Sequence, residues 1–234
     1  MAFRFGIAVF PGTWSDRDCA HAVGLTGAEA VFLWHADKEL KGADCVILPG
    51  GFAHGDYLRA GAIARFAPLM EAVAEHARGG GLVLGICNGF QILCEAGLLP
   101  GALLRNRDLQ FRCQDTTLLV EPTDSPFLAT IASGSRLRIP ISHGEGRYFA
   151  DPATLAGLER GHQVALRYCS PDGDLDDAHN PNGSLSHIAG IVNEAGNVLG
   201  MMPHPERVCE PLLGSEDGLR LFGSVTTGLA AAGR

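Results

Sequence analysis

The sequence predicts an α/β fold: a doubly wound, mostly parallel sheet with helices on both faces and a mixed-sheet extension. In the first half of the chain, short apolar runs alternate with polar or helical connections. This pattern is typical of parallel strands joined by helical crossovers. From residue 100 to about residue 180 the apolar runs are shorter and are divided by proline and aspartate turns, which indicates a mixed sheet built onto the same core.

Length and composition predict one folded unit. The 234 residues contain no linker-like stretch, so we expect a single domain over residues 1–234. A hydrophobic fraction of 46% and 31 glycines suit a buried sheet with many tight turns, and a charged fraction of 19% is too low for a disordered chain.

Charge and cysteine content exclude several kinds of partner. The net charge is −8 and there is no run of basic residues, so a nucleic-acid groove is excluded. The seven cysteines are an odd number without C-x-x-C pairs, so we expect no metal site and a reducing compartment, the cytoplasm. The apolar run at the start stops at Pro11-Gly12. It is too short for a signal peptide or a membrane span, and we expect no membrane association.

The first half of the chain contains strands and helices in alternation. We expect strands at residues 5–10, 30–34, 44–48 and 82–86, and helices at residues 16–25 and 88–96. A further long helix should follow the glycine-rich loop at 49–57, with Asp56 as its N-cap and residues 79–81 as its end. Its buried face would carry Ile63, Phe66, Met70, Val73 and Ala77.

The second half contains shorter elements. We expect strands at residues 116–120, 136–141 and 163–168, a surface loop at 171–183, and a strand pair at 186–193 and 197–202. A final helix at 215–229 would bury Leu219, Phe222 and Val225. The polar cluster at 143–147 has two glycines around Glu145. It fits either a close backbone approach to a ligand or partner, or a solvated turn.

Cys87 lies between the strand at 82–86 and the helix at 88–96, with Gly85 and Gly89 on either side. Small residues around a tight strand-to-helix turn are typical of a nucleophile elbow. The first N–H groups of the helix would favour the thiolate of Cys87. A buried core cysteine is the alternative, and the paired glycines favour the elbow.

The glycine-rich loop at 49–57 follows the strand at 44–48. Ligands of open parallel sheets bind at the carboxyl ends of the strands, so this loop and Cys87 should face one crevice. A flexible turn without function is the alternative. In the functional interpretation, N–H groups of Gly50, Gly51 and Asn88 would stabilise an oxyanion.

His204 stands between Pro203 and Pro205, and Glu206 follows two residues later. A strand-like spacing would direct both side chains to one side. Cys87, His204 and Glu206 together supply the nucleophile, base and acid of a triad.

Three motifs carry a family resemblance: Pro-Gly-Gly at 49–51, Gly-Ile-Cys-Asn-Gly-Phe-Gln at 85–91 and Pro-His-Pro-Glu at 203–206. In this order they resemble the signatures of class I, or triad-type, glutamine amidotransferases, whose fold is flavodoxin-like. The blocks at 55–66, 97–103, 143–147 and 200–207 are similar to the stand-alone glutaminase subunits of phosphoribosylformylglycinamidine synthase. The resemblance covers nearly the whole chain.

The resemblance implies that the chain hydrolyses L-glutamine to glutamate and ammonia through a cysteine thioester. The ammonia would serve a large ATP-dependent synthetase subunit, which converts formylglycinamide ribonucleotide to formylglycinamidine ribonucleotide in purine biosynthesis, in a complex with a small accessory subunit. It also implies Cys87 as nucleophile, His204 as base, Glu206 as its orienting acid and Gln91 as a contact to glutamine. No cofactor would bind to this chain, because ATP and Mg²⁺ would be used by the synthetase.

Two alternatives remain open at this point. The chain could be a glutaminase that serves another synthetase, such as those of GMP, anthranilate or carbamoyl phosphate. It could also be a non-enzymatic or peptidase-like relative whose cysteine elbow is a stress sensor. The family often has Ser-Tyr where this chain has Ala53-His54, which puts a tyrosine hydroxyl contact at the glycine loop in doubt.

Overall fold

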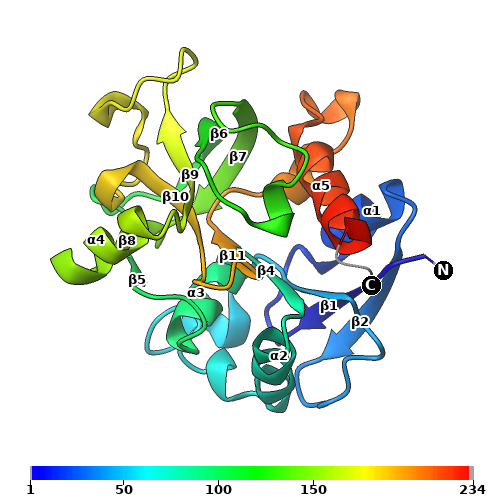
Figure 1. Ribbon diagram of the computed structural model, residues 1–234. Coiled ribbons are helices and arrows are strands. Elements are labelled where there is room, and N and C mark those ends of the chain that lie inside the picture. Colours follow the sequence, from blue (N-terminus) through cyan, green and yellow to red (C-terminus); the bar gives the residue numbers. More distant parts are fainter. Residues whose placement is uncertain (1, 232–234) are drawn as a thin grey trace.

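The computed structural model describes residues 2–231, and a nine-stranded sheet runs through it (Figure 1). One half is parallel, in the order β2 (Glu29–Trp34), β1 (Arg4–Val9), β3 (Cys45–Leu48), β4 (Leu82–Ile86) and β11 (Val198–Met201). The other half is antiparallel and continues through β10 (Ile188–Val192), β9 (Val164–Cys169), β6 (Arg112–Val120) and β7 (Arg136–His143). The predicted mixed extension is therefore part of the same sheet.

Helices cover both faces of the parallel half. On one side α1 (Asp16–Leu25) contacts α5 (Asp217–Ala231), and the two lie side by side in Figure 1. The other side carries α2 (Pro68–Arg78) and α3 (Asn88–Glu95), which pack on β4. This arrangement confirms the predicted doubly wound α/β class.

The prediction for the start of α2 was wrong. Asp56 does not cap this helix, because Asp56 and Leu58 both have left-handed φ angles, +53° and +70°, which a right-handed helix excludes. Residues 53–56 and 64–66 instead form separate 3₁₀ turns, η1 (Ala53–Asp56) and η2 (Ala64–Phe66). Ile63 and Phe66 are consequently exposed. The helix begins only at Pro68, after an extended residue.

Three elements between residues 100 and 160 were not predicted. Two three-residue strands, β5 (Ala102–Leu104) and β8 (Arg147–Phe149), form a small antiparallel sheet, and such short strands leave no periodicity to detect. Helix α4 (Pro152–Arg160) did have a sequence signal. Asp151 accepts hydrogen bonds from the N–H groups of Ala153 and Thr154, and Pro152 stands at the first helical position.

Short 3₁₀ turns complete the chain. The predicted strand at 186–193 starts at Ile188, because η5 (Leu185–His187) precedes it. The predicted surface loop at 171–183 is only partly superficial, since Asn180 and Asn182 are buried in it. The remaining turns are η3 (Pro126–Leu128), η4 (Asp177–His179), η6 (Pro205–Arg207) and η7 (Pro211–Leu213).

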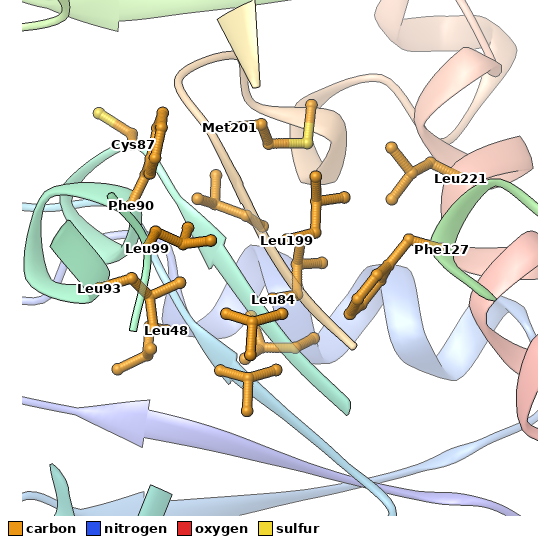
Figure 2. Close-up of a cluster of buried hydrophobic side chains, with 14 of the residues drawn as sticks. Leu48, Leu84, Cys87, Phe90, Leu93, Leu99, Phe127, Leu199, Met201 and Leu221 are labelled. Carbon is orange, nitrogen blue, oxygen red and sulfur yellow. The ribbon is translucent and has the colours of Figure 1, made fainter. Parts of the chain in front are cut away.

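The centre of the core lies where α3 packs on β3 and β4. Figure 2 shows Cys87 at one end of this cluster, beside Phe90, with the leucines of the central strands beyond it. Gly89 allows the close contact. A β-carbon there would lie 1.9 Å from the carbonyl oxygen of Leu48. Since this neighbour is backbone, the first turn of α3 can rest on β3 only without a side chain at residue 89.

The described helices have no membrane-spanning character. Between residues 2 and 231, none is both long and apolar enough to cross a bilayer.

The contact at Gly89 predicts a stability difference between two glycine-to-alanine changes. Gly89→Ala should lower the free energy of unfolding by about 3 kcal/mol, because the methyl group collides with backbone. Gly157→Ala, in α4, should raise it by roughly 0.5–1 kcal/mol, because no atom lies within 4 Å of the new methyl group and alanine favours helix. Urea unfolding followed by circular dichroism measures both. Equal effects would show that the contact with Leu48 does not constrain the elbow.

Candidate functional site

Cys87 occupies the turn between β4 and α3. Its φ and ψ are +50° and −104°, a strained combination for a residue with a side chain. Its N–H donates to the carbonyl of Met201 at 2.7 Å, so the elbow is fixed to the neighbouring strand β11. The predicted strand–cysteine–helix geometry is confirmed, and the strain is typical of a nucleophile elbow.

The thiol of Cys87 lies at the wall of a cavity of about 250 Å³. Its Sγ is 3.8 Å from the carbonyl oxygen of Ser142, at the end of β7, and residue 87 is 6% exposed. The cavity is also lined by Trp14, Gly51, Phe52, Phe111, His204 and Arg207. Cys87 is therefore reachable from this cavity, unlike an inert core cysteine.

His204 and Glu206 are both buried and joined by a 2.6 Å hydrogen bond between Nδ1 and Oε1. A strand-like spacing was predicted to direct both side chains to one side, and this reason was wrong. Pro205 begins the 3₁₀ turn η6, and the tight turn brings the two side chains together. The N–H of His204 donates to the carbonyl of Pro140 at 2.8 Å, which fixes the turn to β7.

The hydrogen bond to Glu206 determines the protonation of His204. Glu206 accepts this bond at Oε1, so Nδ1 carries a proton. Nε2 is on the other side of the ring, toward the cavity. Nε2 makes no hydrogen bond of normal length to any group in residues 2–231. Burial lowers the pKa of His204, but the charges of Glu206 and of a Cys87 thiolate outweigh burial and raise it to about 10. We therefore expect an imidazolium beside Cys87 at neutral pH.

The Pro-Gly-Gly loop packs directly against this histidine. A β-carbon on Gly50 would lie 2.6 Å from Cε1 of His204. Gly51 has a φ of +153°, and a β-carbon there would lie 2.6 Å from the carbonyl oxygen of Gly12. The carbonyl of Gly50 accepts from the N–H groups of Trp14 and Ser15. Residues 50 and 51 must therefore both be glycine, because neighbouring atoms lie too close to leave room for a side chain.

Two backbone donors at the cavity have no partner within the described chain. The N–H of Gly51 and the N–H of Asn88, the first residue of α3, donate to no other group of residues 2–231. Gly51 and Cys87, which precedes Asn88, both line the cavity. Two of the three predicted oxyanion donors are therefore close to the thiol, and their role remains a prediction.

Asn88 and Gln91 form a buried network on the first turn of α3. Asn88 accepts from the N–H of Ala53 at 3.0 Å and donates to Gln91 at 2.9 Å. Gln91 donates to the backbone carbonyl of Glu145 at 2.6 Å. These bonds join the elbow helix to the glycine loop on one side and to the segment at 143–147 on the other.

Asn106 was missed by the sequence reasoning. It is fully buried, accepts from Nδ1 of His143 and from the N–H of Gly146, and donates to the carbonyls of His143 and Gln110. The segment at 143–147 is therefore a turn over the cavity that Asn106 fixes by hydrogen bonds, and not a solvated turn. No local signal identifies Asn106, because its partner segment lies almost 40 residues later in the sequence.

Metal-ligating side chains do not gather in the described chain. Across residues 2–231, no group of three or more histidine, cysteine, aspartate or glutamate side chains is arranged to hold a metal ion. All seven cysteines are free thiols.

The charge coupling at His204 predicts that the stability gained from Glu206 depends on pH. The two proteins to compare are Cys87→Ala and Cys87→Ala/Glu206→Gln, since neither contains a thiol at residue 87 that could titrate. Glu206 raises the pKa of His204, whose unfolded value is about 6.5. Its stabilising effect is fully present below that pH and is lost as pH rises through the folded-state pKa. The gap in free energy of unfolding should therefore shrink from pH 6 to pH 10 in urea titrations. A gap that is constant over this range would contradict the coupling.

Comparison with known proteins places the chain in a family. Residues 2–217 match the family model described as a CobB/CobQ-like glutamine amidotransferase domain. The chain is 60% identical over 223 residues to phosphoribosylformylglycinamidine synthase subunit PurQ of Moorella thermoacetica, covering 95% of this chain and 94% of that protein. It is 56% identical to the PurQ subunit of Gloeobacter violaceus, with 97% and 99% covered.

Two solved structures share the fold. The structure of PurLQS from Thermotoga maritima aligns with a TM-score of 0.86 and 43% identity, covering 97% of this chain and 99% of that one. A putative GMP synthase subunit of Thermoplasma acidophilum aligns with a TM-score of 0.63 at 13% identity, covering 100% and 98%, and that likeness shows the fold alone. On the extent of the family match and the identity to the PurQ subunits, this chain belongs to the CobB/CobQ-like glutamine amidotransferase family.

Proposed function

We propose that this chain is the glutaminase subunit of phosphoribosylformylglycinamidine synthase, hydrolysing L-glutamine to glutamate and ammonia. The observation that carries the proposal is the strained Cys87 elbow opening into the cavity that His204 also lines, with Glu206 hydrogen-bonded behind the imidazole. The near full-length identity to PurQ subunits supports this synthetase over those of GMP, anthranilate or carbamoyl phosphate. The likeness to the putative GMP synthase subunit is limited to the fold.

The first half of the reaction is thioester formation. The Cys87 thiolate attacks the carboxamide carbon of glutamine, and the carbonyl oxygen becomes an oxyanion that accepts from the N–H groups of Gly51 and Asn88. The protonated His204 gives its Nε2 proton to the amide nitrogen as the C–N bond breaks, so that ammonia leaves. Glu206 holds the ring orientation and stabilises the imidazolium throughout.

The second half regenerates the thiol. His204, now neutral, takes a proton from water, which attacks the thioester carbonyl and forms a second oxyanion at the same donors. Collapse of this intermediate breaks the C–S bond, releases glutamate and returns the thiolate–imidazolium pair. Gly50 leaves room for the imidazole throughout, because any side chain at residue 50 would meet it.

The ammonia acceptor belongs to another subunit in this proposal. A large synthetase subunit would use ATP and Mg²⁺ to aminate formylglycinamide ribonucleotide, with a small accessory subunit in the complex, and this chain would bind no cofactor itself. The solved relative is described as PurLQS, a name that fits such a three-part assembly. Free thiols throughout the described chain support a cytoplasmic location.

The synthetase would dock over the cavity mouth. Three aromatic side chains that line the cavity, Trp14, Phe52 and Phe111, are exposed, with Trp14 at 73%. Tyr57 and Leu109, on the same two loops as Phe52 and Phe111, are exposed as well. We call these five residues the apolar rim. Exposed apolar side chains gathered around a reactive site are typical of a surface that a partner covers.

Loss of the thiol should separate the two activities of the assembled complex. Cys87→Ala should reduce glutamine-dependent synthesis to the assay background while ammonia-dependent synthesis remains, because the thiolate acts only in making ammonia. Both rates are measured on the complex with the synthetase and accessory subunits. A glutamine-shaped electrophile, 6-diazo-5-oxo-norleucine, should label Cys87 in the wild type, whereas a stress-sensor cysteine would react without regard to glutamine shape. Equal loss of both synthetic activities in an intact complex would refute the proposed division.

Docking should activate the glutaminase. We expect the chain alone to hydrolyse glutamine about 10²-fold more slowly than the complex, because the loop that carries the Gly51 donor is set by the covering partner. Steady-state ammonia release, with and without the synthetase, measures this factor. Trp14→Ala should lower the gain on docking, and Trp34→Ala, an exposed tryptophan on the edge strand β2, serves as the matched control. A lone chain as fast as the complex would mean that the donors are already in place.

A further inference from the structure

The cavity at Cys87 extends away from His204 toward the first turn of α3. This second part, of about 220 Å³, shares Gly51, Phe52, Cys87, Phe111 and Ser142 with the first. Its other walls are Asp56, Gln91, His143, Gly144 and Glu145. Two carboxylates therefore line the part of the cavity that lies beyond the thiol.

Asp56 is held in this wall by the elbow helix. The Nδ2 of Asn88 lies 3.3 Å from Oδ1 of Asp56 and also donates to Gln91. Ala53, at the start of the turn that ends with Asp56, donates to the Oδ1 of Asn88. The carboxylate is thus positioned from the residue that directly follows Cys87.

This end of the cavity lacks positive charge. Burial and the charge of Glu145 raise the pKa of Asp56 to about 6, while the bond from Asn88 lowers it. Within residues 2–231, no lysine, arginine or histidine forms an ion pair with Asp56. Glu145 pairs with Arg105 at 3.5 Å, and Arg105 is exposed. A half-buried carboxylate pair with one exposed counter-ion is stabilised by a further cation.

His143 gives an independent indication that a hydrogen-bond donor belongs in this cavity. It lines the same part of the cavity and is 3% exposed. Burial, aided by the charge of His204, lowers its pKa to about 3, so the ring is neutral. Its Nδ1 donates to Asn106, whose Oδ1 also accepts from Gly146. Nε2 is then an acceptor, and it has no partner in the described chain.

We propose that Asp56, together with Glu145, binds the α-ammonium group of the glutamine whose carboxamide lies at Cys87. This inference rests on the proposed function. Glutamine carries an ammonium three carbon–carbon bonds from its carboxamide carbon, so a substrate bound at the thiol presents a cation to the next part of the cavity. An ammonium offers three N–H donors and no acceptor. It therefore matches this part of the cavity, where Asp56, Glu145 and Nε2 of His143 are acceptors. Asp56 is in this way a specificity-determining residue for an α-amino acid amide.

Asp56→Asn tests the assignment, because asparagine keeps an oxygen that accepts from Asn88 but removes the charge. In the assembled complex, kcat/KM for glutamine should fall about 10- to 100-fold, the loss of one charge-assisted hydrogen bond. The rate of Cys87 labelling by 6-diazo-5-oxo-norleucine, which carries an α-ammonium, should fall by the same factor. Labelling by iodoacetamide, which has none, should stay within about twofold of the wild type.

Glu71→Gln is the matched control, since it removes a carboxylate that pairs with Lys38 on the surface of α2. It should leave all three rates unchanged. If Asp56→Asn slows labelling by both electrophiles alike, Asp56 has a structural role and the inference is overturned. It is also overturned if the substitution slows labelling by neither. Failure of 6-diazo-5-oxo-norleucine to label Cys87 in the wild type would instead count against the proposed function.

Discussion

The close approach of α3 to the carbonyl of Leu48 is the constraint on which the site depends. Gly89 allows this approach, because any β-carbon there would lie 1.9 Å from that oxygen. With the first turn of the helix pressed onto β3, the chain must reverse within a single residue after β4. That residue is Cys87, and the reversal explains its φ of +50°. The same contact places Asn88 and Gln91 at the edge of the sheet, where they hold the glycine loop and the segment at 143–147.

Sheet register explains how residues over a hundred positions apart meet at this edge. Strands β4 and β11 are parallel neighbours, with Ile86 opposite Met201. The next residue on one strand is Cys87, and the chain after the other reaches His204 only three residues later. Because both strands end at the same level, the thiol and the imidazole face one cavity without a long connection. The bond from His204 N–H to Pro140 then ties this edge to the antiparallel half of the sheet.

The sequence predicted most of the parallel half and the elbow, because buried strands and paired glycines leave local signals. Cys87 and His204 were placed correctly at the cavity, although His204 and Glu206 meet through a 3₁₀ turn and not through strand alternation. The start of α2 was misplaced, since left-handed angles at Asp56 and Leu58 are set by tertiary contacts and not by helix propensity. Asn106 had no local signal at all, because its bonds reach a segment that only the fold brings near.

The polar groups of the cavity share one property that local sequence cannot reveal. Nε2 of His143 and the carboxylates of Asp56 and Glu145 are acceptors in the part of the cavity beyond Cys87, and the N–H groups of Gly51 and Asn88 are donors beside the thiol. Folding leaves the imidazole nitrogen and the two N–H groups without a partner in residues 2–231 and gives the two carboxylates a single exposed counter-ion, Arg105, which is unfavourable in a partly buried space. A molecule with a carbonyl oxygen at one end and an ammonium at the other satisfies both sets together. The arrangement that costs stability in the free chain is therefore the one that orients an amino acid amide with its carboxamide at Cys87.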